Sequence, residues 1–105
     1  MSDYINRKGD EVRSALVKKA KSGKSTYYSE LMENYYISRG YIGKILYCVA
    51  DICHCNKESI LTSLVEKKYG GIGKGYSCVV KKYNADINFE IEQKKCFNYW
   101  KNKNI

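Results

Sequence analysis

The spacing of apolar residues predicts three helices in the first half of the chain. The clearest pattern lies between residues 38 and 57, where apolar side chains return every three or four positions, as on one face of an α-helix. The positions that repeat are Ile42, Ile45, Leu46, Val49, Ile52 and Cys53. A weaker pattern predicts a helix over residues 10–21 with Gly23 as its C-cap, and another that begins near Tyr28 and ends before Ser38. A short extended piece is expected between these two.

The pattern changes in the second half. Residues 60–65 and 76–80 are rich in β-branched and aromatic side chains, which is the composition of strands. The segment between them, residues 69–75, holds four glycines and is typical of a turn. Together these segments predict a β-hairpin with a long, basic tip.

A last helix is expected over about residues 86–101, with Asn84 or Asp86 as its cap. Its buried face would be formed by Phe89, Cys96, Phe97 and Trp100. The order of elements predicts an α+β fold of the winged helix-turn-helix type, with three helices, a β-hairpin wing and a C-terminal helix. The length of 105 residues fits one domain, with residues 1–8 and 102–105 loosely held.

The chain is strongly basic, with 19 Lys and Arg against 11 Asp and Glu and a net charge of +8. Such an excess favours a polyanionic partner, because each phosphate contact releases condensed counterions. A lysine-rich, AT-biased genome gives the same composition without such a partner. Small size and composition suit a phage or low-GC bacterial accessory protein.

No apolar stretch approaches the roughly 20 residues that a membrane-spanning helix needs. The first eight residues also lack the apolar core of a signal peptide. The five cysteines are therefore expected to be reduced thiols in a cytoplasmic, intracellular protein.

The predicted hairpin is a candidate phosphate-binding element. It carries five lysines and no acidic residue between positions 67 and 82. The lysines are Lys67, Lys68, Lys74, Lys81 and Lys82. A solvated basic turn would show the same pattern. The glycine-rich run is not a nucleotide-binding P-loop, because Gly75 follows Lys74 where Ser or Thr is required.

The start of the third helix is the second candidate. Ser38 can cap this helix, or the helix begins just after Gly40. In a helix-turn-helix the first residues of the recognition helix meet the DNA groove, which would bring Arg39, Tyr41 and Lys44 to bases or phosphates. An ordinary solvated helix start remains the alternative.

No catalytic or metal-binding constellation is evident. Cys53 and His54 are adjacent on a helix and point apart, so they do not form a nucleophile–base pair. A zinc site built from Cys48, Cys53, His54 and Cys55 would crowd its ligands on one helix. We therefore expect no metal, no cofactor and no enzymatic activity.

Four short segments occur in a characteristic order: residues 28–31, 39–43, 61–65 and 70–76. This order resembles the DNA-binding domain of the alkylguanine-DNA alkyltransferases and the alkyltransferase-like proteins over roughly residues 12–80. It is also similar to small bacterial and phage-type domains, whose pattern residues 41–45 and 61–65 fit better.

The resemblance implies a winged helix-turn-helix that holds duplex DNA, in the minor groove as in those families. The side chains that it would place against DNA are Tyr28, Arg39, Tyr41 and Lys44. Thr62 occupies the position of the reactive cysteine and Ser63 that of its histidine, so alkyl transfer is not implied. Arg39 stands one position from the family's arginine, so base extrusion is not implied either.

The sequence thus predicts a non-enzymatic protein of phage or mobile-element origin that binds double-stranded DNA. The expected contact residues are Tyr28, Ser38, Arg39, Tyr41, Lys44, Lys67, Lys68, Lys74, Lys81 and Lys82. The main alternative is a small basic counter-defence inhibitor that binds and blocks a host protein. A third is a redox or metal sensor built on Cys48, Cys53 and Cys55. The oligomeric state is left open.

Overall fold

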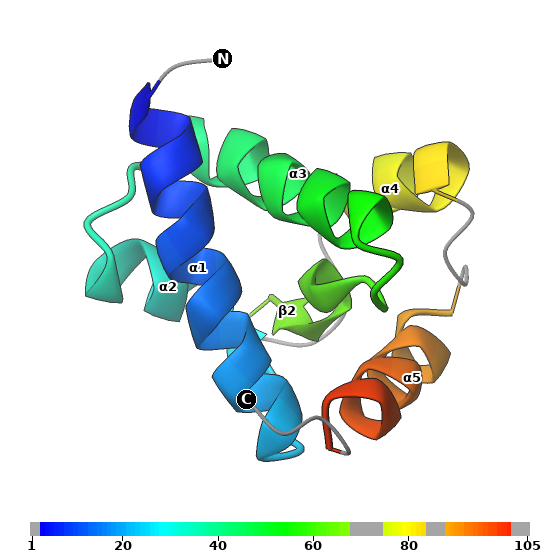
Figure 1. Cartoon of the computed structure of the whole chain (residues 1–105). Helices are drawn as coiled ribbons and strands as arrows, with labels where there is room; N and C mark the ends of the chain where they lie inside the picture. Colours follow the sequence, from blue (N-terminus) through cyan, green and yellow to red (C-terminus); the bar gives the residue numbers. More distant parts are fainter. Residues whose placement is uncertain (1–2, 68–74, 84–87, 102–105) are drawn as a thin grey trace.

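The computed structural model describes residues 3–67, 75–83 and 88–101. Helices make up most of this part of the chain, and two short strands complete it (Figure 1). In chain order the elements are α1 (Asp3–Lys21), β1 (Thr26–Tyr27), α2 (Tyr28–Asn34), α3 (Arg39–Cys55), the 3-10 turn η1 (Leu61–Leu64), β2 (Val65–Glu66), α4 (Gly75–Tyr83) and α5 (Phe89–Lys101).

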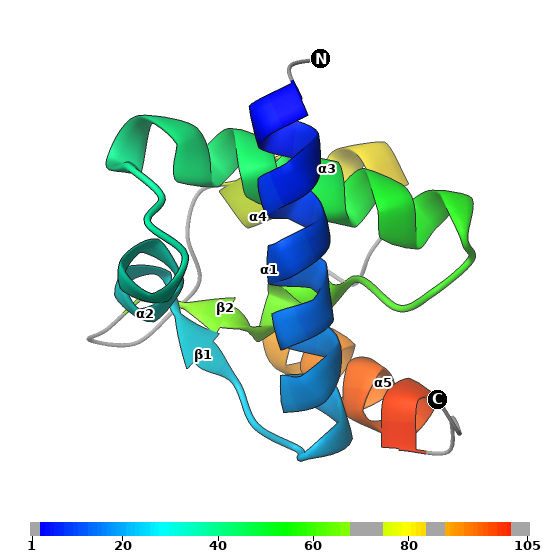
Figure 2. The same cartoon turned by 60° about the vertical axis from the view of Figure 1, so that its left-hand side comes forward.

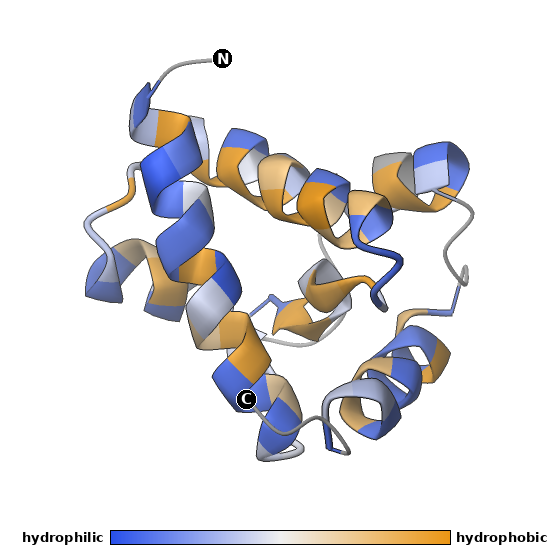
Figure 3. Cartoon of the chain, viewed as in Figure 1, coloured by the Kyte–Doolittle hydropathy of each residue, from blue (hydrophilic) through white to orange (hydrophobic). Residues whose placement is uncertain are grey.

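The crossing of α1 and α3 forms the centre of the molecule (Figure 2). Val12 and Leu16 of α1 and Ile45 and Val49 of α3 are completely buried between these helices and their neighbours. The apolar sides of both helices face inward, as Figure 3 shows by colour. At the crossing the helices lie close, since a Cβ added to Gly9 would stand 3.2 Å from the Cys48 sulfur.

The two strands tie distant parts of the chain together. They pair in parallel, with Thr26 opposite Val65 and Tyr27 opposite Glu66. The turn η1 leads into β2 and packs against α1, α3 and α5. In the sequence, α2 and α3 therefore lie between β1 and β2, and the pairing of these strands holds the two ends of this segment side by side (Figure 2).

The first three helices end in the same backbone motif, the Schellman motif. In each, the third residue after the last helical residue donates its N–H back to a carbonyl five positions earlier, and the residue before it adopts a positive φ. The bonds are Lys24 N to Lys19 O, Ile37 N to Met32 O and Glu58 N to Cys53 O, at 2.9, 2.9 and 2.8 Å. The residues with positive φ are Gly23, Tyr36 and Lys57. The prediction that Gly23 ends the first helix is confirmed.

The winged helix-turn-helix prediction is wrong, because no β-hairpin exists in the described ranges. Residues 76–80, expected as a strand, belong to α4. Among the side chains described on it, Tyr76, Val79 and Tyr83 are buried, and their spacing of three and four is that of a helix. The β-branched pair at 79–80 was misleading, since composition alone does not separate a short strand from a buried helix. The predicted glycine turn lies largely outside the described residues.

The other predicted hairpin strand, residues 60–65, is mostly η1, and only Val65 continues into β2. Every residue of this run is buried, so neither a helical nor a strand period marks it. The chain is thus mainly helical, with a two-stranded parallel sheet in place of the wing.

The remaining boundaries differ less from the prediction. α1 begins at Asp3, seven residues before the expected start, so residues 3–8 belong to a helix. α5 begins at Phe89, where the Asn88 side chain accepts hydrogen bonds from the N–H groups of Glu90 (2.9 Å) and Ile91. The expected caps Asn84 and Asp86, and the terminal residues 102–105, lie outside the described part of the chain.

Candidate nucleic-acid interface

The structure brings four of the predicted contact residues together. Ser38, Arg39, Tyr41 and Lys44 are all exposed and occupy the turn before α3 and its first two turns. Tyr28 begins α2 and is half-buried against the core. The other described candidates, Lys67, Lys81 and Lys82, are exposed after β2 and on α4. Lys68 and Lys74 lie outside the described residues.

Local structure fixes the turn from α2 to α3. Ile37, 4% exposed, anchors the turn in the core, and Tyr36 before it adopts the left-handed conformation. Ser38 is the N-cap residue of α3, and its carbonyl accepts from the N–H groups of Tyr41 and Ile42. Its hydroxyl makes no capping bond, so the predicted cap is correct in place but not in side-chain chemistry.

One face of α3 points away from the core along its whole length. The residues of this outer face are Gly40, Gly43, Lys44, Tyr47, Asp51 and His54. The second half of the face is covered by α4, where the Tyr83 hydroxyl donates to Asp51 at 2.7 Å and the Tyr83 ring lies 4.7 Å from His54. The first half, around Gly40 and Gly43, has no such cover from the described elements (Figure 1).

Gly40 and Gly43 have no role in the fold that explains them. A Cβ added at either position would meet no atom within 4 Å in the described part of the chain beyond its own helical backbone, and neither glycine has a positive φ. Glycine inside a helix destabilises it by about 1 kcal/mol relative to alanine. These two positions thus leave α3 less stable than it could be, while they leave its backbone open to close approach.

The surroundings of this open face are basic and aromatic. No acidic residue occurs from Tyr35 to Ala50. The Lys44 ammonium stands 5.6 Å from the centre of the Tyr41 ring, and the Tyr4 ring of α1 meets Tyr41 edge-on at 5.3 Å. The surface therefore places the positive charge of Lys44 beside the exposed aromatic ring of Tyr41.

Lys82 continues the basic surface along α3. Its ammonium lies 4.8 Å from the centre of the Tyr47 ring and 5.4 Å from that of Tyr83. A hydrogen bond with Tyr47 raises the pKa of Lys82, so its charged form is favoured. Because Tyr47 follows Lys44 by one turn, the two lysines flank the same side of the helix.

Cys53 and Cys96 are buried thiols. Burial raises the pKa of Cys53 to about 11 and that of Cys96 to about 12, so both thiols stay protonated at neutral pH. His54 contacts the Tyr83 ring. Thr62, at the position that the family resemblance gives to a reactive cysteine, is buried with its hydroxyl unpaired in the described structure.

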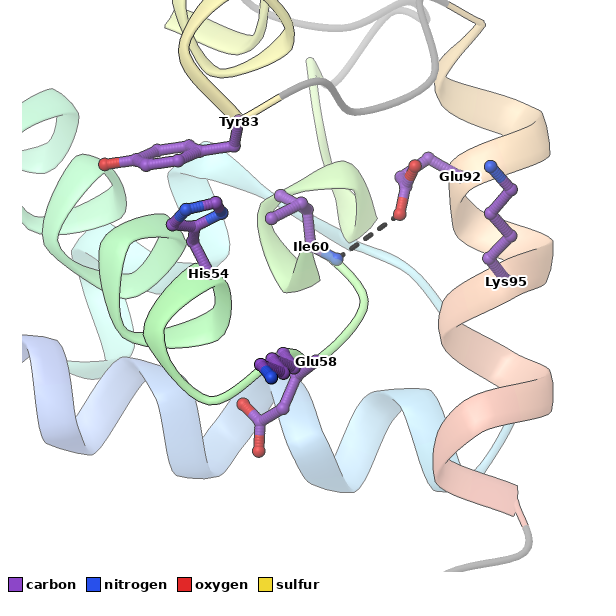
Figure 4. Close-up of a pocket in the computed structure, with 7 residues that line it drawn as sticks. His54, Glu58, Ile60, Tyr83, Glu92 and Lys95 are labelled. Carbon is purple, nitrogen blue, oxygen red and sulfur yellow. Dashed lines mark hydrogen bonds between the residues drawn. The ribbon is translucent and has the colours of Figure 1, made fainter.

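A hollow of about 340 Å³ lies between the end of α3 and α5, at the opposite end of α3 from Gly40 and Gly43, and His54 and Tyr83 are among its lining residues (Figure 4). Its carboxylates are already engaged: Glu58 points toward α1, where Arg13 binds it, and Glu92 accepts the N–H of Ile60 at 3.3 Å. Sequence reasoning missed this hollow because its lining comes from segments far apart in the chain.

Comparison of the chain with protein-family models, with curated proteins and with solved structures finds no match. None of the described helices is long and apolar enough to cross a bilayer.

Proposed function

We propose that the chain is a non-enzymatic protein that binds double-stranded DNA through the first half of α3. The observation that carries the proposal is the open outer face of this helix. Gly40 and Gly43 expose its backbone, and Arg39 and Lys44 flank them with positive charge. A partner must therefore approach the helix closely and be negatively charged, which are two properties of a DNA groove and its phosphate walls.

The residue types suit contact with phosphates and bases. Arginine binds phosphate or a guanine edge with two hydrogen bonds, and lysine binds phosphate as a point charge. The net charge of +8 adds long-range attraction to DNA. The resemblance to the alkyltransferase-like proteins points to the same three side chains, Arg39, Tyr41 and Lys44. The proposal does not depend on a hairpin wing.

The test is a titration of labelled duplex DNA at two salt concentrations. We expect binding that weakens steeply with salt, and the variant Lys44→Ala should reduce the slope of log K against log salt by about 0.9, the value for one phosphate contact. Lys18→Ala is the matched control, since Lys18 is an exposed lysine in the last turn of α1, at the far end from α3's start. Absence of duplex binding at low salt would refute the proposal.

A second candidate is the small basic inhibitor that binds a host protein. It is favoured by three exposed tyrosines, Tyr27, Tyr36 and Tyr41, because tyrosine and arginine are common anchors of protein interfaces. A protein partner would be bound with a weaker dependence on salt and without competition from DNA. Competition between the two in the same titration separates the candidates.

A further inference from the structure

Tyr36 occupies a position that suits glycine. It is the left-handed residue of the Schellman motif that ends α2, with a φ of 56°. Side chains with a Cβ are strained in this conformation, and a bulky ring more so than asparagine. Yet the Tyr36 side chain is not tucked into the core, because the residue is 86% exposed.

The end of α1 gives an internal comparison. The hydrogen bond that closes its Schellman motif has the same length as that of α2, 2.9 Å, and the φ of its left-handed residue is similar, 67°. That residue is Gly23. The fold therefore needs the backbone shape at position 36 and the buried Ile37 after it, and glycine would supply that shape. Nothing in the turn itself calls for a tyrosine.

No interaction within the described part of the chain stabilises the Tyr36 side chain. It has no hydrogen bond, ring contact or ion pair there, unlike Tyr41, which contacts Tyr4 and Lys44. The backbone strain at an exposed aromatic residue, which no contact in the described part of the chain offsets, points to an external partner.

Charge indicates the chemistry of that partner. Tyr36 lies three residues before Arg39, inside the stretch that has no acidic residue. The main-chain carbonyl of its neighbour Tyr35 accepts a hydrogen bond from the Lys8 ammonium at 2.8 Å; that ammonium is also paired with Glu11, so the unpaired positive charge near the turn comes from Arg39 and Lys44. A partner that combines negative charge with flat apolar faces is a nucleic acid, whose bases stack on tyrosine rings.

We propose that Tyr36 stacks on an unpaired base beside the duplex, so that the chain prefers DNA with an unpaired base to continuous duplex. This inference rests on the proposed function, because α3 must hold the duplex for Tyr36 to reach such a base. In continuous duplex each base is stacked on its neighbours, so a ring reaches a base face only by unstacking a step, which costs free energy, whereas an unpaired base offers its face at a lower cost. The substrate class is thus a duplex with a bulge or an unpaired end.

The experiment compares two duplexes of the same sequence, one continuous and one with a single bulged 2-aminopurine. The wild type should bind the bulged duplex roughly 5- to 160-fold more tightly, the range that stacking of one base on an aromatic ring provides. Stacking should also quench the 2-aminopurine fluorescence.

Three variants separate the ring from the fold. Tyr36→Phe keeps the ring and should keep the preference and the quenching. Tyr36→Gly and Tyr36→Asn should bind both duplexes equally, while their midpoints of thermal unfolding should equal or exceed that of the wild type because the strain is relieved.

The outcomes distinguish the two proposals. Binding of continuous duplex without a preference for the bulge, or a preference that survives in Tyr36→Gly, would overturn the role of Tyr36 and leave the proposed function standing. Failure to bind either duplex would overturn the proposed function and, with it, this inference.

Discussion

Arg13 of α1 binds Glu58, which follows α3, with two hydrogen bonds from one guanidinium nitrogen, at 2.8 and 2.6 Å. The Glu58 side chain is 9% exposed, so the ion pair is partly shielded from solvent. Arg13 also lies over the Trp100 ring of α5, 5.8 Å from its centre. One side chain thus links the first helix, the end of the third and the last.

We expect Glu58→Gln to lower the free energy of unfolding by about 1.5–3 kcal/mol, the range for hydrogen bonds to a charged group. The loss arises because the Arg13 guanidinium keeps its burial and loses its counter-charge. Urea unfolding followed by circular dichroism measures the change. The matched control is Glu90→Gln, which alters an exposed carboxylate on α5 and should change stability by less than about 0.5 kcal/mol. Equal effects of the two variants would contradict the expected role of the pair.

The open face of α3 gives a prediction in which stability and binding change in opposite directions. Gly43→Ala should raise the free energy of unfolding by up to about 1 kcal/mol, because alanine favours the helix and its Cβ meets no neighbour. The same variant should weaken DNA binding, because the methyl group prevents close approach to the helix. Unfolding curves and duplex titrations on the same preparations test both halves. A more stable variant that binds as tightly as the wild type would show that the glycines do not face the partner.

The buried thiols predict loss of stability at high pH. Burial raises the pKa of Cys96 from its ordinary 9.0 to about 12, so above pH 9 the unfolded chain releases this proton while the folded chain retains it. The free energy of unfolding therefore keeps its full value, as far as this thiol is concerned, below pH 9. It falls as pH rises toward 12, by about 1.4 kcal/mol per pH unit for one such thiol.

Unfolding measured between pH 7 and 10.5 tests this dependence. Cys96→Ala should be less stable at neutral pH, because it leaves a cavity, but should lose less stability as pH rises. Cys55→Ser, which changes an exposed cysteine, should follow the wild-type curve. Parallel curves for Cys96→Ala and the wild type would rule out the thiol as the titrating group.

Helices with a long apolar period were predictable from the sequence. The boundaries of α2 and α3 agree with the pattern because each apolar position of α3, from Ile42 to Cys53, lies at least half-buried. The pattern failed at α4, a helix of nine residues, because its β-branched residues give it the composition of a strand. It failed at η1 because a run that is buried on all sides has no period.

The candidate site was predictable in its charges and not in its shape. Arg39, Tyr41 and Lys44 stand out in the sequence as basic and aromatic residues at a helix start. The open space at Gly40 and Gly43 depends on which elements cover α3, and the conformation of Tyr36 depends on how the turn closes over Ile37. Both are properties of the tertiary structure that no local pattern carries.

The parallel pairing of Thr26 with Val65 determines how this surface is assembled. The proposed contact residues at the start of α3, and Tyr36 before it, lie in the loop that this pairing closes, so the loop must close before α2 and α3 have a defined relation to the rest of the chain. Contacts between residues so far apart in sequence form slowly, because the chain loses entropy before it gains them. A chain truncated before Val65 would retain every proposed DNA contact on α3 and still lack the closure that holds them in place.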